Sequence, residues 1–224
     1  MLLLHGLFSN AETNWIKFGH AAVIAAAGFR AIMPDLRAHG QSAHPHDPAA
    51  YPPDVLAHDG LALIAHLGLG NYDLGGYSLG GRTVVRMVTL GANPSRLIVS
   101  GMGLRGLLST GDRADHFRHI LTGLGMHKRG SPEWLAEAFL RTTGGDSKAL
   151  LLLLGSFVDT PEAELTAIRQ PTLVLSGADD DDNGSSEELA ALLPNGKYVE
   201  VPGNHMSAVT KPELGREIAR FLAA

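Results

Sequence analysis

The segment from Gly76 to Gly81, G-Y-S-L-G-G, has the residue types of a reactive serine held on a sharp turn. An apolar stretch precedes it and another, 82–90, follows, so Ser78 falls at a predicted strand-to-helix junction. A serine hydroxyl is a weak nucleophile until a neighbouring base takes its proton. The turn exposes the hydroxyl, and the flanking glycines let strand and helix approach closely. The pattern therefore indicates nucleophilic chemistry at Ser78.

An imidazole base must accompany such a serine, and the chain has eleven histidines. His205 ends the loop P-G-N-H, directly after a predicted strand, where a tight loop can bring its ring over the serine. His116, His119 and His127 lie in a segment with no predicted strand. We therefore expect His205 to act as the base.

A carboxylate that orients the imidazole is expected after another strand. The strand ending near Gly177 is followed by four aspartates, 179–182, and four adjacent carboxylates cannot all be desolvated. One of them is expected to pair with His205, while the others are solvated. A calcium loop of the EF-hand type does not fit, because the distal glutamate and the flanking helices are missing.

Two backbone N–H groups are needed to stabilise the oxyanion that would form on the substrate. The residue after the nucleophile, Leu79, supplies one. Leu7, in the loop after the first predicted strand, is the natural second donor, because Gly6 lets that backbone approach closely. Around this centre we expect a mainly apolar substrate pocket, with walls from Phe8, Tyr77, Trp134 and Met206.

The elements that must position these residues alternate along the chain. Short apolar runs predict strands at 1–4, 30–33, 72–77, 97–100, 172–176 and 197–201. Apolar residues at helical spacing predict helices at 15–27, 53–67, 78–90, 185–193 and 212–222. Strands alternating with long helices favour an α/β fold with a mostly parallel, doubly wound sheet. Residues 104–168 differ, since they have helical spacing and no clear strand.

In a parallel sheet the carboxyl ends of the strands share one edge, and ligands bind there. The chemistry-bearing residues each follow a predicted strand: His5, Asp35, Ser78, Asp180 and His205. We therefore expect them to gather at one edge of the sheet.

Taken together, these motifs resemble those of the α/β-hydrolase superfamily, in its small, capped, esterase-like branch with a serine nucleophile. L-L-L-H-G at 2–6 is similar to its oxyanion segment, and D-L-R-A-H-G-Q-S at 35–42 to its D-x-R-G-x-G-x-S loop, with Ala38 in place of a glycine. The resemblance implies that the acid is Asp180, the third residue after Gly177, with Asp179 or Asp181 as alternatives if the loop register slips. It also implies a core of residues 1–103 and 169–224 and a helical cap of residues 104–168 over the site.

The resemblance leaves one departure. The family has two further strands before the first one here, and Met1 already lies inside that strand. We therefore expect either a truncated start or a sheet with a bare edge near the N-terminus. Such an edge invites pairing with another chain, so a monomer or a homodimer is expected.

Composition excludes several classes of function. The net charge is −5 and no basic cluster stands out, so neither nucleic acid nor an anionic membrane is an expected partner. There is no cysteine, no apolar run long enough to span a bilayer, and no signal-peptide pattern, so a cytoplasmic protein is expected. His44 and His46 have a metal-like spacing but no clear third ligand. We expect neither a metal nor a cofactor.

The leading hypothesis is a carboxylesterase-like serine hydrolase. It would cleave esters of small to medium, largely apolar molecules through an acyl-enzyme. An alternative is a C–C bond hydrolase or cofactor-free lyase with the same triad, since the elbow with Arg82 is similar to elbows of that branch. A second alternative, from another class, is a ligand-binding protein on a hydrolase scaffold.

Overall fold

The computed structural model describes residues 1–224, and its centre is a five-stranded parallel sheet. The strands run in the order β1-β2-β3-β4-β5, each parallel to its neighbour. They are β1 (Leu2–Leu4), β2 (Leu74–Tyr77), β3 (Leu97–Ser100), β4 (Thr172–Gly177) and β5 (Gly196–Val201). Every residue of β1 to β4 is buried, as expected for strands covered on both faces. The α/β-hydrolase-like sheet predicted from the sequence is confirmed.

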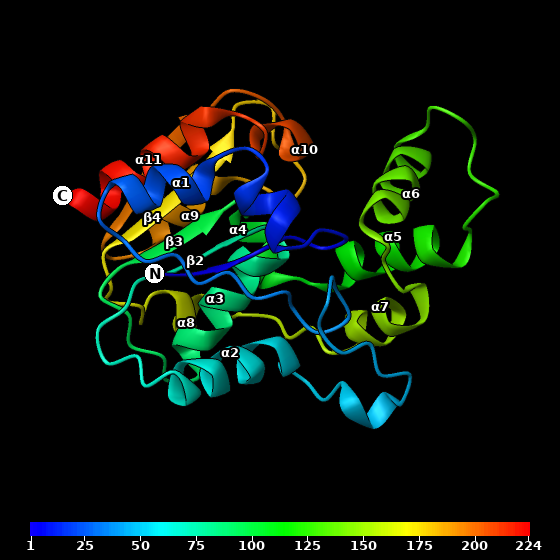
Figure 1. Ribbon diagram of the computed structural model, residues 1–224, viewed down its shortest axis with the longest axis horizontal. Coiled ribbons are helices and arrows are strands. Elements are labelled where there is room, and N and C mark those ends of the chain that lie inside the picture. The colour runs from blue at the N-terminus through cyan, green and yellow to red at the C-terminus, as the bar shows by residue number, and fades with distance from the viewer.

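Helices cover both faces of this sheet (Figure 1). On one face α1 (His20–Ala26) packs against α11 (Pro212–Ala223), and their apolar residues join alternate residues of the strands in one core cluster. On the other face α2 (Val55–His66), α3 (Leu79–Thr89) and α9 (Ser186–Leu192) cover the remaining strand residues in a larger cluster. Because successive side chains of a strand point to opposite faces of the sheet, the apolar core is divided into one cluster on each face.

No strand lies between β3 and β4; that segment is helical. It forms α4 (Leu104–Leu108), α5 (Gly111–Thr122), α6 (Pro132–Thr143), α7 (Ser147–Leu154) and α8 (Glu162–Leu165). α5, α6 and α7 stand together beyond the carboxyl ends of the strands (Figure 1), whereas α4 packs on α9 and α8 on α3. The predicted helices are present, and the division into a core and a cap of 104–168 stays a prediction.

The helix predicted at 15–27 is wrong in one respect, because it is two elements. A short π-helical turn, η1 (Glu12–Ile16), is separated from α1 by Gly19, whose φ of 81° no helix accommodates. The remaining short elements are a 3₁₀ turn, η2 (Pro48–Ala50), and a four-residue helix, α10 (His205–Ala208), which lies between β5 and α11. None of the helices combines the length and the apolar character that crossing a bilayer requires.

The structure also corrects the expectation that the sheet edge beside the first strand is bare. Residues 30–33 run along β1, with Leu3 N–H donating to Ile32 O and Ile32 N–H to Met1 O, both at 2.9 Å. The contact is one isolated bridge rather than the predicted strand, since Pro34 has no N–H with which to extend it. The open edge therefore belongs to 30–33, and self-association through it stays a prediction.

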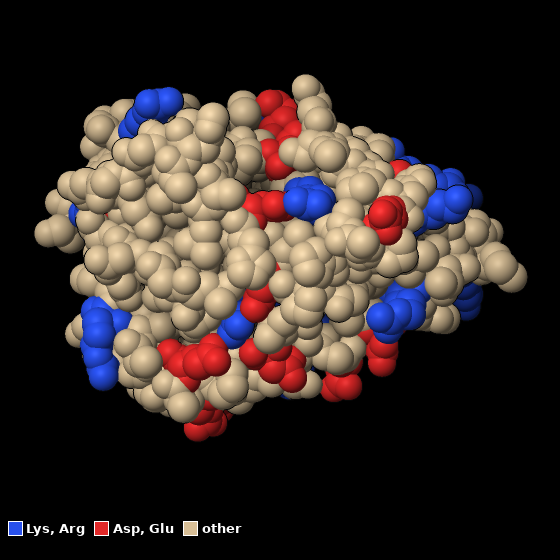
Figure 2. All heavy atoms as spheres, turned by 90° about the horizontal axis from the view of Figure 1, so that it is seen from below, with Lys and Arg blue, Asp and Glu red and all other residues tan.

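Surface charge is mixed on the face shown in Figure 2. Lys and Arg side chains lie among Asp and Glu side chains there, without a continuous basic area.

Candidate active site

Ser78 lies on the turn between β2 and α3, in a strained backbone conformation. Its φ of 54° and ψ of −113° are angles that a residue with a side chain rarely adopts. The turn is so tight that a Cβ at Gly76 would lie 2.2 Å from the backbone of Gly80, and a Cβ at Gly80 would lie 2.2 Å from the backbone oxygen of Leu4. Small residues are therefore required at these two positions, and the side chain of Ser78 is presented at the carboxyl end of the sheet.

Ser78, His205 and Asp180 form one hydrogen-bonded chain. Ser78 Oγ lies 2.9 Å from His205 Nε2, and His205 Nδ1 lies 2.9 and 3.1 Å from the two carboxylate oxygens of Asp180. A carboxylate only accepts, so Nδ1 carries the ring proton and Nε2 is free to accept the proton of Ser78. The arrangement is that of a nucleophile, a base and an orienting acid.

The four carboxylates of the aspartate loop, residues 179–182, differ in burial and in hydrogen-bond partner. The Asp180 side chain is 3% exposed and bonds His205, and its Oδ1 also accepts from the N–H of Asp182 at 3.3 Å. Asp179 and Asp181 are exposed, and the side chain of Asp182 pairs with Arg113 at 2.6 Å. Of the alternatives open in the sequence, the geometry brings Asp180 to the imidazole.

Tyr77, the last residue of β2, holds the backbone of His205 in place. The Tyr77 hydroxyl donates to the backbone oxygen of His205 at 2.6 Å, and the two rings lie 5.6 Å apart. Burial raises the pKa of the Tyr77 phenol, so it remains a donor at any working pH. At the start of α10, Asn204 and Ser207 form a capping box that fixes the loop.

The expected oxyanion donors lie beside Ser78. Leu79 is the first residue of α3, where a backbone N–H has no intrahelical acceptor, and the N–H of Leu7 has no acceptor in the protein. Gly6 lies against the serine, since a Cβ there would be 3.4 Å from Ser78 Cβ. The Gly6 N–H donates to Oδ1 of the buried Asn14 at 3.0 Å, which anchors the loop carrying Leu7.

His5 supports this loop as a neutral ring. Its Nε2 accepts the Leu36 N–H at 2.9 Å, so Nδ1 carries the proton and donates to the Gly6 oxygen at 2.9 Å. Burial lowers the pKa of His5 to about 4. Asp35 is also structural, because its carboxylate accepts backbone N–H groups of Ala11 and Gln41 at 2.8 Å. His5 follows β1, as predicted, whereas Asp35 follows the isolated bridge at Ile32 rather than a strand, and neither residue is hydrogen-bonded to Ser78 Oγ.

A cavity of about 270 Å³ opens beside the serine. Tyr77 and Met206 line it, as the sequence predicts, together with Ser78 and His205. Further lining residues come from η1, the turn after it and α6: Thr13, Asn14, Lys17, Phe18, Phe139 and Thr142. The break at Gly19 and the position of α6 bring them there.

Two predicted pocket residues do not line this cavity. Phe8 has a φ of 62°, which turns its side chain into the core, where it is 2% exposed and packs edge-on against Phe117. Trp134 lies about 140° around α6 from the cavity residue Phe139, since successive helical residues turn by about 100°. Both predictions are wrong because side-chain direction follows from local backbone geometry that the sequence pattern did not reveal.

A second, much smaller cavity of about 20 Å³ touches the serine from another side. Leu7, Leu79 and Ser78 line it, with Arg82 one turn along α3. The remaining lining residues are Met102, Arg113, Phe117, Phe157 and Asn183. No group of three or more His, Asp or Glu side chains is gathered closely enough to hold a metal ion.

A family model described as the alpha/beta hydrolase family matches residues 1–214. The chain belongs to the α/β-hydrolase family. Among solved structures, an esterase from Exiguobacterium antarcticum is similar with a TM-score of 0.79 and 18% identity, over 100% of this chain and 91% of that one. A hydrolase from Pseudomonas aeruginosa has a TM-score of 0.75 at 24% identity, over 100% and 90% of the two chains. A bromoperoxidase from Bacillus anthracis also reaches 0.75, at 21% identity over 100% and 91%. At these identities the similarity concerns the fold, which hydrolases of different specificity share.

Proposed function

We propose that this α/β-hydrolase family member hydrolyses carboxylic esters with Ser78 as nucleophile. The observation that carries the proposal is the continuous hydrogen-bonded chain from Ser78 Oγ through His205 to Asp180, at 2.9 Å for each of its two links. A binding protein has no use for this chain, whereas acyl transfer requires each of its three groups.

In the first half of the reaction His205 Nε2 takes the proton from Ser78 as the oxygen attacks the ester carbonyl. The carbonyl oxygen becomes an oxyanion, which the Leu7 and Leu79 N–H groups stabilise. Asp180 stabilises the imidazolium, which then protonates the alcohol oxygen as the C–O bond breaks. The alcohol leaves and an acyl-enzyme remains on Ser78.

In the second half a water molecule takes the place of the alcohol. His205 accepts one proton from this water while the hydroxyl oxygen attacks the acyl carbon, and it returns the proton to Ser78 Oγ as the acid leaves. The sum is ester plus water giving acid plus alcohol. Every proton passes through the His205 ring, so the chemistry is complete with side chains and backbone groups of this chain.

The cavity supports a small or medium substrate. Its volume of about 270 Å³ is just below the range of about 300–1,000 Å³ that is usual for small-molecule sites. Aromatic and aliphatic side chains such as Phe18, Phe139 and Met206 share its wall with Thr13 and Lys17. We therefore propose esters whose larger half is mainly apolar.

A fluorophosphonate probe tests the nucleophile directly, because it is attacked by an activated serine and loses fluoride. The native protein should be labelled, Ser78→Ala should not, and Ser95→Ala, which changes an exposed serine bonded to Asn71, should be labelled like the native protein. Absence of labelling in a folded native protein, judged by circular dichroism, excludes the proposal.

Substrate panels then separate ester hydrolysis from C–C bond hydrolysis, which the same three groups can perform. p-Nitrophenyl esters of increasing acyl length should be hydrolysed in a Ser78-dependent way. Turnover of a vinylogous 1,5-diketone in preference to every ester would show that the bond cleaved is C–C, and would overturn the ester proposal while leaving Ser78 as the nucleophile.

A further inference from the structure

The proposed oxyanion donor Leu7 lies in a tight turn with an unusual residue at its second central position. The N–H of Ser9 donates to the Gly6 oxygen at 3.2 Å, so Leu7 and Phe8 are the central residues of a β-turn. Phe8 has a φ of 62°, whereas the φ of Leu7 is negative. This combination is that of a type II turn, in which the second central residue is usually glycine.

A phenylalanine in this conformation is strained, because its Cβ crowds the backbone at positive φ. Such strain persists only where the surrounding structure holds it. Relaxation of Phe8 to a negative φ would turn over the peptide between Leu7 and Phe8 and change the ψ of Leu7. The contacts that hold Phe8 therefore decide whether the Leu7 N–H keeps its direction beside Ser78.

Two contacts hold Phe8, and both come from the helices between β3 and β4. The hydroxyl of Thr143, the last residue of α6, donates to the Phe8 oxygen at 2.7 Å. No other group of the protein donates to this oxygen, and Phe8 is 2% exposed, so water has little access to it. The Phe8 ring packs edge-on against Phe117 of α5, with the ring centres 5.3 Å apart. The turn is thus held by residues more than a hundred positions later in the chain.

The hydroxyl of Thr143 also has acceptors on its own helix, but they lie farther away. A threonine in a helix commonly bonds the oxygen three or four residues earlier. Here those oxygens, of Leu140 and Phe139, lie at 3.1 and 3.4 Å, and the Leu140 oxygen already accepts the Gly145 N–H. A hydroxyl has one proton to donate, so Thr143 gives it to its nearest acceptor, the Phe8 oxygen.

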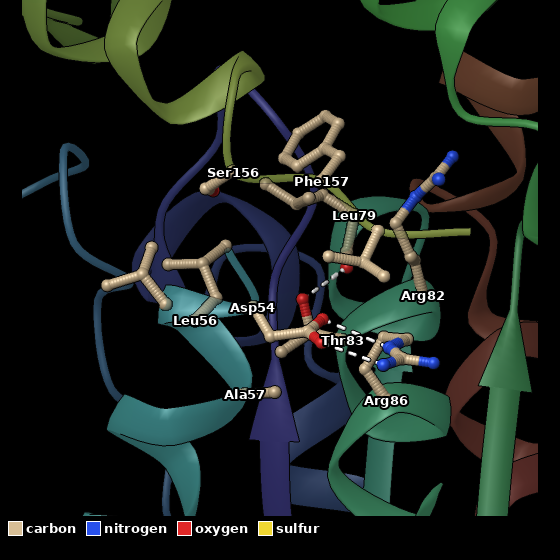
Figure 3. Close-up of a pocket in the computed structure, with 11 residues that line it drawn as sticks. Asp54, Leu56, Ala57, Leu79, Arg82, Thr83, Arg86, Ser156 and Phe157 are labelled. Atoms are coloured by element: carbon tan, nitrogen blue, oxygen red, sulfur yellow. Dashed lines mark hydrogen bonds and ion pairs between the residues drawn. The ribbon is translucent and has the colours of Figure 1, made fainter. Parts of the chain in front are cut away.

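The other proposed donor, Leu79, is held within its own helix. Figure 3 shows the hydroxyl of Thr83 bonded to the Leu79 oxygen, at 2.7 Å and one turn along α3. This bond is local and forms whenever α3 forms. The turn that carries Leu7 depends instead on a threonine from a distant part of the chain, Thr143.

We propose that Thr143 is a positioning residue for the oxyanion site and acts by holding the strained turn at Leu7 and Phe8. The proposal rests on the ester hydrolysis proposed above and concerns the same reaction. Thr143 lines neither cavity beside Ser78, so its substitution leaves the substrate contacts as they are. Its effect should therefore fall on the transition state.

Thr143→Val tests this role, because valine has the shape of threonine without the hydroxyl. With p-nitrophenyl acetate, kcat should fall about 10-fold, a fraction of the loss that follows complete removal of an oxyanion donor. KM should stay within about twofold of the native value. Acylation and deacylation both pass through an oxyanion, so kcat falls whichever step is slower. Thr143→Ser keeps the hydroxyl and should restore kcat to within about twofold of native.

Thr122→Val is the matched control. Thr122 is the last residue of α5, as Thr143 is of α6, and its hydroxyl donates to the Arg118 oxygen of its own helix at 2.8 Å. This variant should keep the native kcat and KM. Urea unfolding of both valine variants shows whether a loss of kcat comes from a loss of folded protein.

A trifluoromethyl ketone gives a readout that a purely structural role does not move. Ser78 Oγ adds to its carbonyl carbon while the serine proton passes to His205, and the former carbonyl oxygen becomes an oxyanion like that of the transition state. The Ki of 1,1,1-trifluoropropan-2-one should rise in Thr143→Val by the factor by which kcat/KM falls. It should stay at the native value in Thr122→Val.

Several outcomes overturn the role of Thr143 and leave ester hydrolysis intact. They are a native kcat or Ki in Thr143→Val, an equal loss in Thr122→Val, and a loss that Thr143→Ser does not restore, each in protein that fluorophosphonate labels. If Thr143→Val does not fold, Thr143→Ala, which favours the helix, is measured in its place. A native protein that fluorophosphonate does not label removes both proposals.

Discussion

Replacing Asn14 by leucine is expected to slow catalysis more than it weakens the fold. Asn14 Oδ1 is the acceptor for the buried N–H of Gly6, at 3.0 Å, and Gly6 precedes the proposed oxyanion donor Leu7. Without this bond the Leu7 N–H loses its fixed direction. Asn14 is thus a positioning residue that also lines the cavity. Loss of its hydrogen bond should lower kcat, because an oxyanion contact strengthens in the transition state, and a change in KM would report the altered cavity wall.

The magnitude follows from the contacts. An unpaired buried N–H costs about 1–3 kcal/mol of stability. Part of this is regained, because the Asn14 Nδ2 is itself buried without a partner and leaves with the side chain. We therefore expect a net loss of about 1 kcal/mol in the free energy of unfolding. Complete loss of an oxyanion donor costs about 100- to 1,000-fold in kcat. Displacement rather than loss should cost about 10- to 100-fold, which corresponds to about 1.4–2.7 kcal/mol.

Steady-state hydrolysis of p-nitrophenyl acetate and urea unfolding measure the two effects separately. Asn10→Leu is the matched control, since Asn10 Oδ1 accepts the Thr13 N–H at 2.7 Å at the start of the same turn, away from Gly6. It should lose a similar amount of stability and keep its kcat. Native kcat in Asn14→Leu, or an equal loss of kcat in both variants, refutes the positioning role.

Three further predictions concern stability. Burial lowers the pKa of His5 to about 4 from an unfolded value of 6.5, so between these pH values the unfolded chain binds a proton that the folded chain does not. The free energy of unfolding should therefore fall by about 3 kcal/mol as the pH falls from 6.5 to 4. Urea unfolding of His5→Gln should show a smaller loss. Gly80→Ala should prevent stable folding, because its Cβ would lie 2.2 Å from a backbone oxygen of β1, whereas Gly70→Ala, with nothing within 4 Å, should change the melting temperature little. Arg86→Met should cost about 3–5 kcal/mol, because it leaves the carboxylate of Asp54, which is 11% exposed and directly precedes α2, unpaired. Glu164→Gln, at a side chain 44% exposed, should cost about 1 kcal/mol or less.

Each of these has an outcome that contradicts it. An equal loss of stability with acid in His5→Gln and in the native protein would show that the ring is not a buried neutral group. Normal melting of Gly80→Ala would contradict the close approach of α3 to β1. Equal effects of the Arg86 and Glu164 substitutions would mean that burial does not decide the strength of this ion-pair network.

The positions of Ser78, His205 and the aspartate loop at 179–182 were predictable because local patterns and parallel topology carry the information. A glycine-flanked serine between a strand and a helix needs no distant contact to be recognised, and each residue follows a strand whose end lies at the same edge. The role of Asn14 could not be predicted, for a different reason. Asn14 lies on η1, and its hydrogen bond to the Gly6 N–H, eight residues away in the chain, exists only once the loop after β1 and this turn have folded together.

By itself, therefore, the sequence determined the sheet class, the order of the elements and the set of groups able to do chemistry, since strand and helix periodicity and turn residues act over a few positions. Only the tertiary structure decided which aspartate meets His205, which side chains wall the cavity, and that Phe8 and Trp134 do not. Side-chain direction and burial arise from packing between segments far apart in the chain, and no local pattern encodes them.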